Sequence, residues 1–237
     1  MTVGSITWDV ARVGGLMAYA LTTASVLIGI LLSLKWRNET WPRFVTNELH
    51  RFVTLVGLVF VGVHTLAVAL DPFIGFTPLE VIVPFAAHYR PLYVALGIVA
   101  AYVAIAVYLS ERLRSRIGYD WWRRFHFLAF AVFVLATVHG LGTGSDSRAP
   151  WAIALYAGSG ILVLGLLALR MLPSRAGDGH PVVAAVVVLL AVEMVLWAAT
   201  GPLRTGWNEV ANNGNGSGAA PSAAPAGTGV GGGASFP

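Results

Sequence analysis

The 237-residue sequence contains no cysteine and few charged residues. The lack of cysteine excludes disulfides, iron–sulfur clusters held by thiolates, and covalently attached c-type heme. Charged residues make up only 11% of the chain, whereas 57% of the residues are apolar and the mean hydropathy is +0.73. This composition is typical of polytopic membrane proteins. The fold class that it predicts is an all-α membrane protein.

Two motifs are also missing. No A-x-A-like cleavage site follows the first hydrophobic segment, whose start carries Asp9 and Arg12 instead of a basic region. We therefore expect a retained helix and not a signal peptide. No G-x-G-x-x-G stands in a strand–helix setting, and the hydrophobic segments leave no room for a nucleotide-binding domain. The sequence thus predicts no flavin or nicotinamide domain of its own.

Six segments are apolar and long enough to cross a bilayer. Pro91, Pro150 and Pro181 stand where helices can begin, because the first turn of a helix leaves N–H groups unpaired and proline has none. Asn47 and Asp120 are candidate N-caps for the second and fourth segments. The sequence predicts a six-helix transmembrane bundle with spans at 10–34, 48–70, 91–109, 122–141, 151–172 and 181–200.

The predicted spans form one domain, residues 8–207. Within it, the stretch 73–91 contains three prolines and Gly75, so a re-entrant or surface-lying segment is expected there and not a spanning helix. From residue 208 onward the chain is almost entirely Gly, Ala, Ser, Pro and Asn. Such a composition cannot bury a core, so residues 208–237 are predicted to be a disordered tail.

The basic residues predict an orientation in a plasma or inner membrane. Eleven of the fifteen lie in or beside the loops after spans one, three and five, which places these loops in the cytoplasm and both termini outside. The net charge of +4 is therefore better explained by topology than by nucleic-acid binding. The eleven are Lys35, Arg37, Arg43, Arg51, Arg112, Arg114, Arg116, Arg123, Arg124, Arg170 and Arg175, and the others are Arg12, Arg90, Arg148 and Arg204.

Two of the predicted spans carry two histidines each. His50 and His64 are fourteen residues apart, which on a straight helix separates them by about 40° around the axis and about 21 Å along it. His126 and His139 are thirteen apart and differ by about 220°, so that span either meets two partners on different sides or is distorted. The predicted topology puts His50 and His126 at the cytoplasmic level and His64 and His139 at the outer level.

Four histidines at two matching levels favour heme. A polar ring buried in lipid is costly without a partner, and one such histidine is usually explained by a hydrogen bond between helices. Neutral imidazole is also an axial ligand of heme iron, and two imidazoles leave no open position, which suits electron transfer. We therefore predict two b hemes, an inner one held by His50 and His126 and an outer one held by His64 and His139.

Several strings around these histidines resemble a known family. WPRFVTNELHR, YRPLYVALG, GYDWWRRFHFLAF and VHGLGTGSD, together with the histidine spacings, resemble the ferric reductase-like transmembrane domain over roughly residues 8–207. That family includes the membrane cores of ferric reductases and NADPH oxidases and the heme subunit of bacterial methionine sulfoxide reductase systems. The resemblance implies six helices, and it implies that His50, His64, His126 and His139 bind two hemes.

The resemblance also implies an oxidoreductase component that carries electrons across the membrane. Eukaryotic members add cytosolic FAD and NAD(P)H domains, which this sequence lacks. The donor is therefore expected to be a separate flavoprotein reductase or a membrane quinol. The expected acceptor on the outer side is ferric iron or a redox partner, with an FMN-binding protein among the candidates.

Arginines near the histidines are candidate partners for the heme propionates. Arg51, Arg123 and Arg124 stand beside the inner pair, and Arg90 and Arg148 lie on the outer side. Anchoring of the chain at the membrane surface explains the first three equally well.

Four other residues have two interpretations each. His88, in the outer loop, is either a contact for an acceptor or metal or an ordinary loop histidine. Glu193 is the one acid well within a span, suited to a proton or quinone role or to a hydrogen bond between helices. Gly14 and Gly15 of the first span are better explained by helix packing than by cofactor binding.

Two other functions stay open at this stage. A heme-free transporter or assembly protein would use the histidines as a proton or metal path. A heme carrier or sensor would hold one heme that is easily lost and would not accept electrons from quinol or flavin donors.

Overall fold

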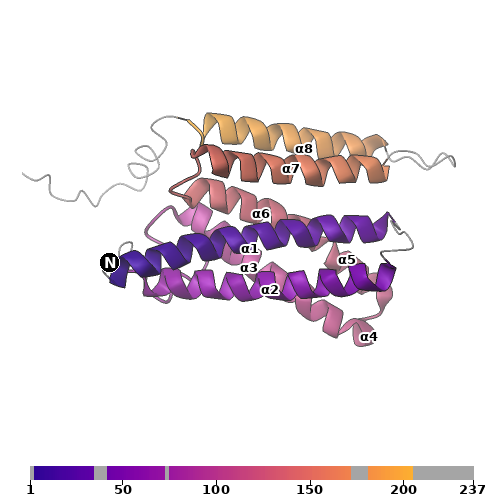
Figure 1. Cartoon of the computed structure of the whole chain (residues 1–237), viewed down its shortest axis with the longest axis horizontal. Coiled ribbons are helices and arrows are strands. Elements are labelled where there is room, and N and C mark those ends of the chain that lie inside the picture. The colour runs from indigo at the N-terminus through magenta and orange to yellow at the C-terminus, as the bar shows by residue number, and fades with distance from the viewer. Residues whose placement is uncertain (1–2, 35–41, 73–74, 172–180, 205–237) are drawn as a thin grey trace, which may run out of the picture.

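The computed structural model describes residues 3–34, 42–72, 75–171 and 181–204, and helices are the only regular elements in these ranges (Figure 1). The predicted all-α class is confirmed. The predicted tail, residues 208–237, lies outside the described residues. The helices are α1 (Val3–Ser33), α2 (Arg43–Leu70), α3 (Pro91–Arg112), α4 (Arg114–Ile117), α5 (Tyr119–His126), α6 (Leu128–Thr143), α7 (Pro150–Met171) and α8 (Pro181–Thr200).

Five stretches of the described chain are long and apolar enough to span a membrane. They coincide with the first five predicted spans and make the chain a multi-pass membrane protein. The predicted sixth span corresponds to α8, of which the stretch Ala191–Thr200 counts as a shorter apolar helix. The five are Ile6–Ser33, Arg43–Leu70, Pro91–Arg112, Tyr119–Thr143 and Pro150–Arg170.

Proline sets the start of several helices. Pro91, Pro150 and Pro181 are the first residues of α3, α7 and α8, as predicted. Pro42 precedes α2 with extended backbone angles (φ −70°, ψ 152°), so α2 begins at Arg43, five residues before its predicted start.

Both predicted N-caps were wrong. Asn47 lies inside α2, because that helix already begins at Arg43 after Pro42. Asp120 lies in the first turn of α5, where its carboxylate interacts favourably with the positive end of the helix dipole. The residue at the cap position of α5 is Gly118, whose φ of 80° is accessible to glycine at little cost.

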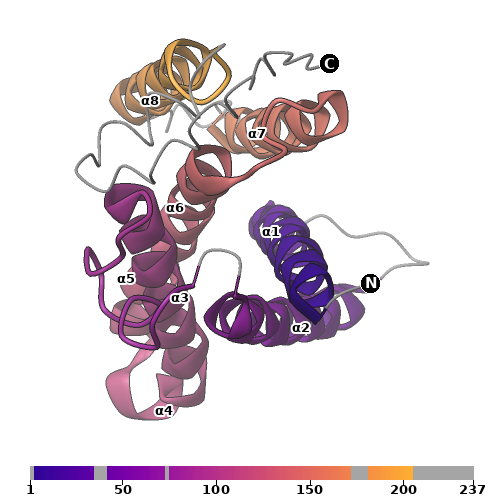
Figure 2. The same cartoon turned by 90° about the vertical axis from the view of Figure 1, so that its left-hand side faces the viewer.

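The helices form two groups that face each other. α1 and α2 are an antiparallel pair, packed closely enough that a Cβ on Gly57 of α2 would lie 3.3 Å from the Leu21 side chain. α3 packs against α6, and Figure 2 shows α3, α5 and α6 to one side of the α1–α2 pair, with α7 and α8 beyond α6. A buried cluster joins α1 to α6 and α7, and it consists of Tyr19, Val26, Ile30, Phe133 and Val163.

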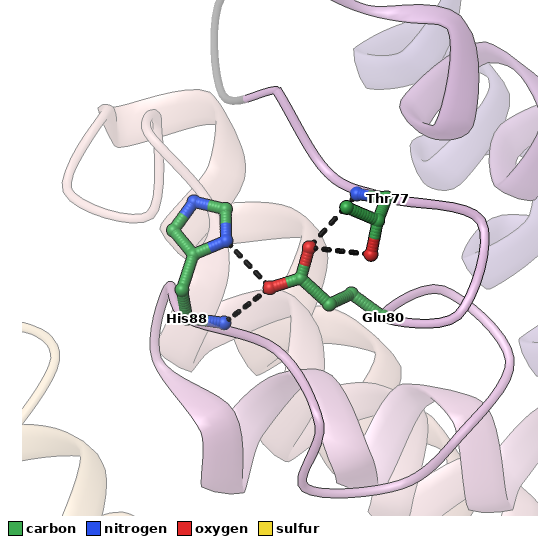
Figure 3. Close-up of polar contacts among 3 residues, drawn as sticks. All are labelled: Thr77, Glu80 and His88. Carbon is green, nitrogen blue, oxygen red and sulfur yellow. Dashed lines mark hydrogen bonds and ion pairs between the residues drawn. The ribbon is translucent and has the colours of Figure 1, made fainter.

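The loop between α2 and α3 is organised by one carboxylate. From Gly75 to the start of α3, the described part of this loop consists of turns and contains no helix. Glu80 accepts hydrogen bonds from the backbone N–H (2.8 Å) and hydroxyl (2.9 Å) of Thr77. It also accepts bonds from the backbone N–H (2.9 Å) and Nδ1 (2.6 Å) of His88 (Figure 3). Thr77 and His88, eleven positions apart, are thus both hydrogen-bonded to the Glu80 side chain.

This carboxylate predicts how the loop responds to acid. Hydrogen bonds, first from the Thr77 backbone and then from the His88 side chain, lower the pKa of Glu80 from 4.5 to about 2. A lowered pKa means that the stabilisation is complete above pH 4.5 and disappears as the pH falls through about 2. We expect slow amide exchange at Thr77 and His88 at pH 5, and faster exchange at that pH in Glu80→Ala. Glu48→Ala, which removes an exposed carboxylate elsewhere, is the control; equal exchange in both variants would contradict the prediction.

Candidate functional site

The four intramembrane histidines meet in two pairs. The ring centres of His50 and His126 are 6.0 Å apart, and those of His64 and His139 are 6.2 Å apart. Two imidazoles that share one metal need about 2 Å for each metal–nitrogen bond and about 1.1 Å from nitrogen to ring centre, which separates the centres by about 6.2 Å. Both pairs therefore have the separation that a shared axial metal requires.

A break in the helix lets His126 and His139 face α2 together. On an ideal helix these two side chains would point about 220° apart. In the structure α5 ends at His126, and Phe127 (φ −63°, ψ −19°) separates it from α6. The spacing of thirteen residues required either two partners or a distorted helix, and a distorted helix is what is found.

Backbone carbonyls orient both histidines of the His64–His139 pair. His64 Nδ1 lies 2.7 Å from the carbonyl oxygen of Ala11 on α1. His139 Nδ1 lies 2.9 Å from the carbonyl oxygen of Tyr93 on α3. Because a carbonyl can only accept, each Nδ1 carries the proton, and each Nε2 keeps a lone pair for a metal. This is the arrangement that metal-bound histidines ordinarily adopt.

The other pair is held less firmly. His50 Nδ1 is 3.4 Å from the Ser25 hydroxyl, which is 2.6 Å from the hydroxyl of Thr54. His126 Nδ1 is buried and has no hydrogen-bond partner within the described ranges. The two levels of the site therefore differ in how their histidines are supported.

Glycines make room for the imidazole rings. A Cβ on Gly97 of α3 would lie 2.5 Å from His139 Nδ1, and one on Gly15 of α1 would lie 2.9 Å from His64 Nδ1. A Cβ on Gly29 would lie 3.4 Å from the His50 ring. The sequence predicted that Gly15 serves helix packing. In the structure the group that packs against it is the ring of His64, a candidate ligand. Gly15 and Gly29 of α1 are fourteen residues apart, as are His50 and His64 of the antiparallel helix α2. This matching spacing is visible in the sequence and could have indicated these contacts.

A cavity separates the two pairs along the helices. It is lined by residues of α1, α2, α3 and α6, and its polar groups are hydroxyls, among them those of Ser25, Thr54 and Tyr108. A largely apolar wall suits a flat hydrophobic macrocycle. Apolar side chains that line the cavity include Val26, Val61, Ala104, Val107, Ala129 and Val132. The residues present, paired imidazoles beside an apolar cavity, fit heme.

The three arginines predicted beside the first pair point to the surface. Arg51 forms an ion pair with Glu48 at 3.3 Å. The guanidinium carbons of Arg123 and Arg124 lie 5.9 Å and 5.0 Å from the centres of neighbouring aromatic rings. All three are exposed. To reach a group between the helices, these side chains would have to leave their present contacts.

The remaining candidates lie away from the cavity. Arg90 is buried at the other end of the bundle and donates to the Gly142 carbonyl, three residues after His139. Arg148 is exposed, and so is Glu193 on α8. His88 is bound to Glu80 in the α2–α3 loop.

Comparisons with known proteins give one positive result. Searches of curated proteins and of solved structures returned no match. The model of the family described as "Ferric reductase like transmembrane component" matches residues 14–137, just over half of the chain. The matched region contains His50, His64 and His126, and it ends two residues before His139. The chain therefore belongs to the ferric reductase-like transmembrane family.

Proposed function

We propose that this protein is a diheme b-type cytochrome that carries electrons across the membrane. The observation that carries the proposal is the ring-centre separation of 6.0 and 6.2 Å in two histidine pairs at two levels of one bundle. Heme held by two imidazoles supplies one-electron transfer without an open coordination position. The paired assignment is His50 with His126 and His64 with His139.

The proposed heme-binding domain comprises residues 8–207, and other residues in it position the histidines and line the cavity. The carbonyls of Ala11 and Tyr93 hold the Nδ1 protons of the outer ligands and so direct their Nε2 atoms inward. The valine- and alanine-rich cavity wall offers an apolar surface between the two levels. Arg51, Arg123 and Arg124 are proposed to attract anionic groups to the end of the bundle that carries α4.

The distribution of basic residues supports a direction. With the α4 end in the cytoplasm, electrons enter at the His50–His126 level and leave at the His64–His139 level, with both termini outside the plasma or inner membrane. The donor is a separate flavoprotein reductase or a membrane quinol. The acceptor is ferric iron or an outer redox partner such as an FMN-binding protein, which makes the chain an oxidoreductase component.

A spectrum of the purified protein tests the proposal. We expect a Soret band, a reduced-minus-oxidised α-band of b type, and about two hemes per chain, as two six-coordinate bis-histidine sites require. A protein with no Soret band would be the heme-free transporter or assembly protein. A protein with one readily lost heme that neither quinol nor reduced flavin reduces would be the carrier or sensor.

A further inference from the structure

Three buried side-chain atoms at the α4 end have no hydrogen-bond partner among the described residues. They are Thr46 Oγ1, Trp122 Nε1 and His126 Nδ1. Thr46 precedes His50 by four residues on α2, and Trp122 precedes His126 by four residues on α5. The same helix position before each histidine of this pair thus carries a buried polar group in need of a partner.

The helix geometry places both groups beyond the histidine pair. Four residues correspond to about 6 Å along a helix and about 40° around it. α2 and α5–α6 run in the same direction, since His50 and His126 meet at one level and His64 and His139 at the next. Thr46 and Trp122 therefore flank the gap between the two helices, one turn closer to the α4 end than the imidazoles.

Both groups are fixed in place and can donate. Thr46 is only 4% exposed, and its hydroxyl can donate one hydrogen bond. The Trp122 ring stacks on His126 with centres 5.1 Å apart, and the guanidinium carbon of Arg114 lies 4.5 Å from the Trp122 ring centre. These contacts hold the indole without using its N–H, which can only donate. A buried donor without an acceptor is unfavourable, so an acceptor between the helices would stabilise the site.

At the corresponding helix position, the other histidine pair has no donor. The residues four positions before His64 and His139 are Phe60 and Leu135, whose side chains cannot form hydrogen bonds. This position therefore carries a buried polar group at the level of His50 and His126 but not at the level of His64 and His139.

We propose that Thr46 and Trp122 bind the carboxylate groups of the porphyrin at the His50–His126 level, with that edge of the porphyrin facing the α4 end. This inference rests on the proposed function. A b-type porphyrin is apolar except for two carboxylates on one edge, and these need donors where they leave the apolar cavity. Arg114, whose guanidinium carbon lies 4.5 Å from the Trp122 ring centre, adds a positive charge that favours an anion there.

Two conservative substitutions test the inference in the purified holoprotein. Thr46→Val keeps the shape of the side chain but removes the hydroxyl, and Trp122→Phe keeps an aromatic ring on His126 but removes the N–H. We expect each variant to transfer one of its two hemes to excess apomyoglobin roughly ten times faster than the parent, the usual effect of losing one charge-assisted hydrogen bond. The propionate bending bands in the resonance Raman spectrum should shift, and Thr46→Ser should restore the parent values.

Matched controls exist on the same helices. Thr65→Val removes an α2 hydroxyl that bonds the Val61 carbonyl of its own helix, and Trp121→Phe alters the exposed neighbour of Trp122. Both should behave like the parent. Two hemes with parent-like transfer rates and unchanged propionate bands in Thr46→Val and Trp122→Phe would overturn this inference alone. A parent without heme would overturn the proposed function as well. If Trp122→Phe does not accumulate, Thr46→Val decides the question.

Discussion

Replacing His64 with alanine is expected to leave about one heme per chain of the two in the parent, because a bis-histidine site with one imidazole no longer holds its iron at both axial positions. His126→Ala should also leave about one, but at the other level, since the two pairs share no residue. Heme per chain from the pyridine hemochromogen, together with the reduced-minus-oxidised spectrum, measures both losses.

The control for these substitutions is His88→Ala. His88 is bound to Glu80 in the α2–α3 loop, outside both pairs, and its replacement should leave two hemes in place. Parent stoichiometry in both His64→Ala and His126→Ala would remove the axial assignment. Loss of both hemes in either variant would show instead that the two levels depend on each other, which the separate ligand sets argue against.

The pairing of the histidines could be predicted from the sequence because it follows from periodicity and topology. Fourteen residues place His50 and His64 on one face of α2, and the basic loops make the second histidine span run parallel to it. The levels of His126 and His139 then follow. The position of the break that turns both toward α2 did not follow, because Phe127 is neither proline nor glycine and tertiary packing decides where such a helix yields.

The hydrogen-bond partners of the paired histidines could not be predicted from the sequence for a different reason. His64 and His139 are oriented by the backbone carbonyls of Ala11 and Tyr93, and every residue type has such a carbonyl. Only the packing of α1 on α2 and of α3 on α6 selects them. The N-cap prediction for α2 was wrong for a similar reason. Asn47 has a suitable side chain for a cap, but the helix begins earlier, directly after Pro42.

Among the glycines that face an imidazole of the two pairs, Gly97 should have the largest effect when alanine replaces it. Its Cβ would lie 2.5, 2.6 and 2.8 Å from Nδ1, Cε1 and Cγ of His139, closer than side chains tolerate. The ring cannot move aside freely, because its Nδ1 is bonded to Tyr93 on the same helix as Gly97. We expect loss of that bond, a cost of about 1–3 kcal/mol in stability from overpacking, and loss of the outer heme. Heme content, the spin state of the remaining iron and the thermal midpoint measure these effects.

The other glycines turn this into a graded series. Gly15→Ala, with its Cβ 2.9 Å from His64 Nδ1, should weaken the same level less, and Gly29→Ala, at 3.4 Å from the His50 ring, should have little effect. Gly62→Ala on α2 meets nothing within 4 Å, and alanine should even raise helix stability there by up to about 1 kcal/mol. An order of heme loss that did not follow these distances would contradict the view that glycine is present to admit an imidazole. The expected order would show that glycines of α1 and α3 are needed where histidines of the neighbouring helices α2 and α6 pack against them.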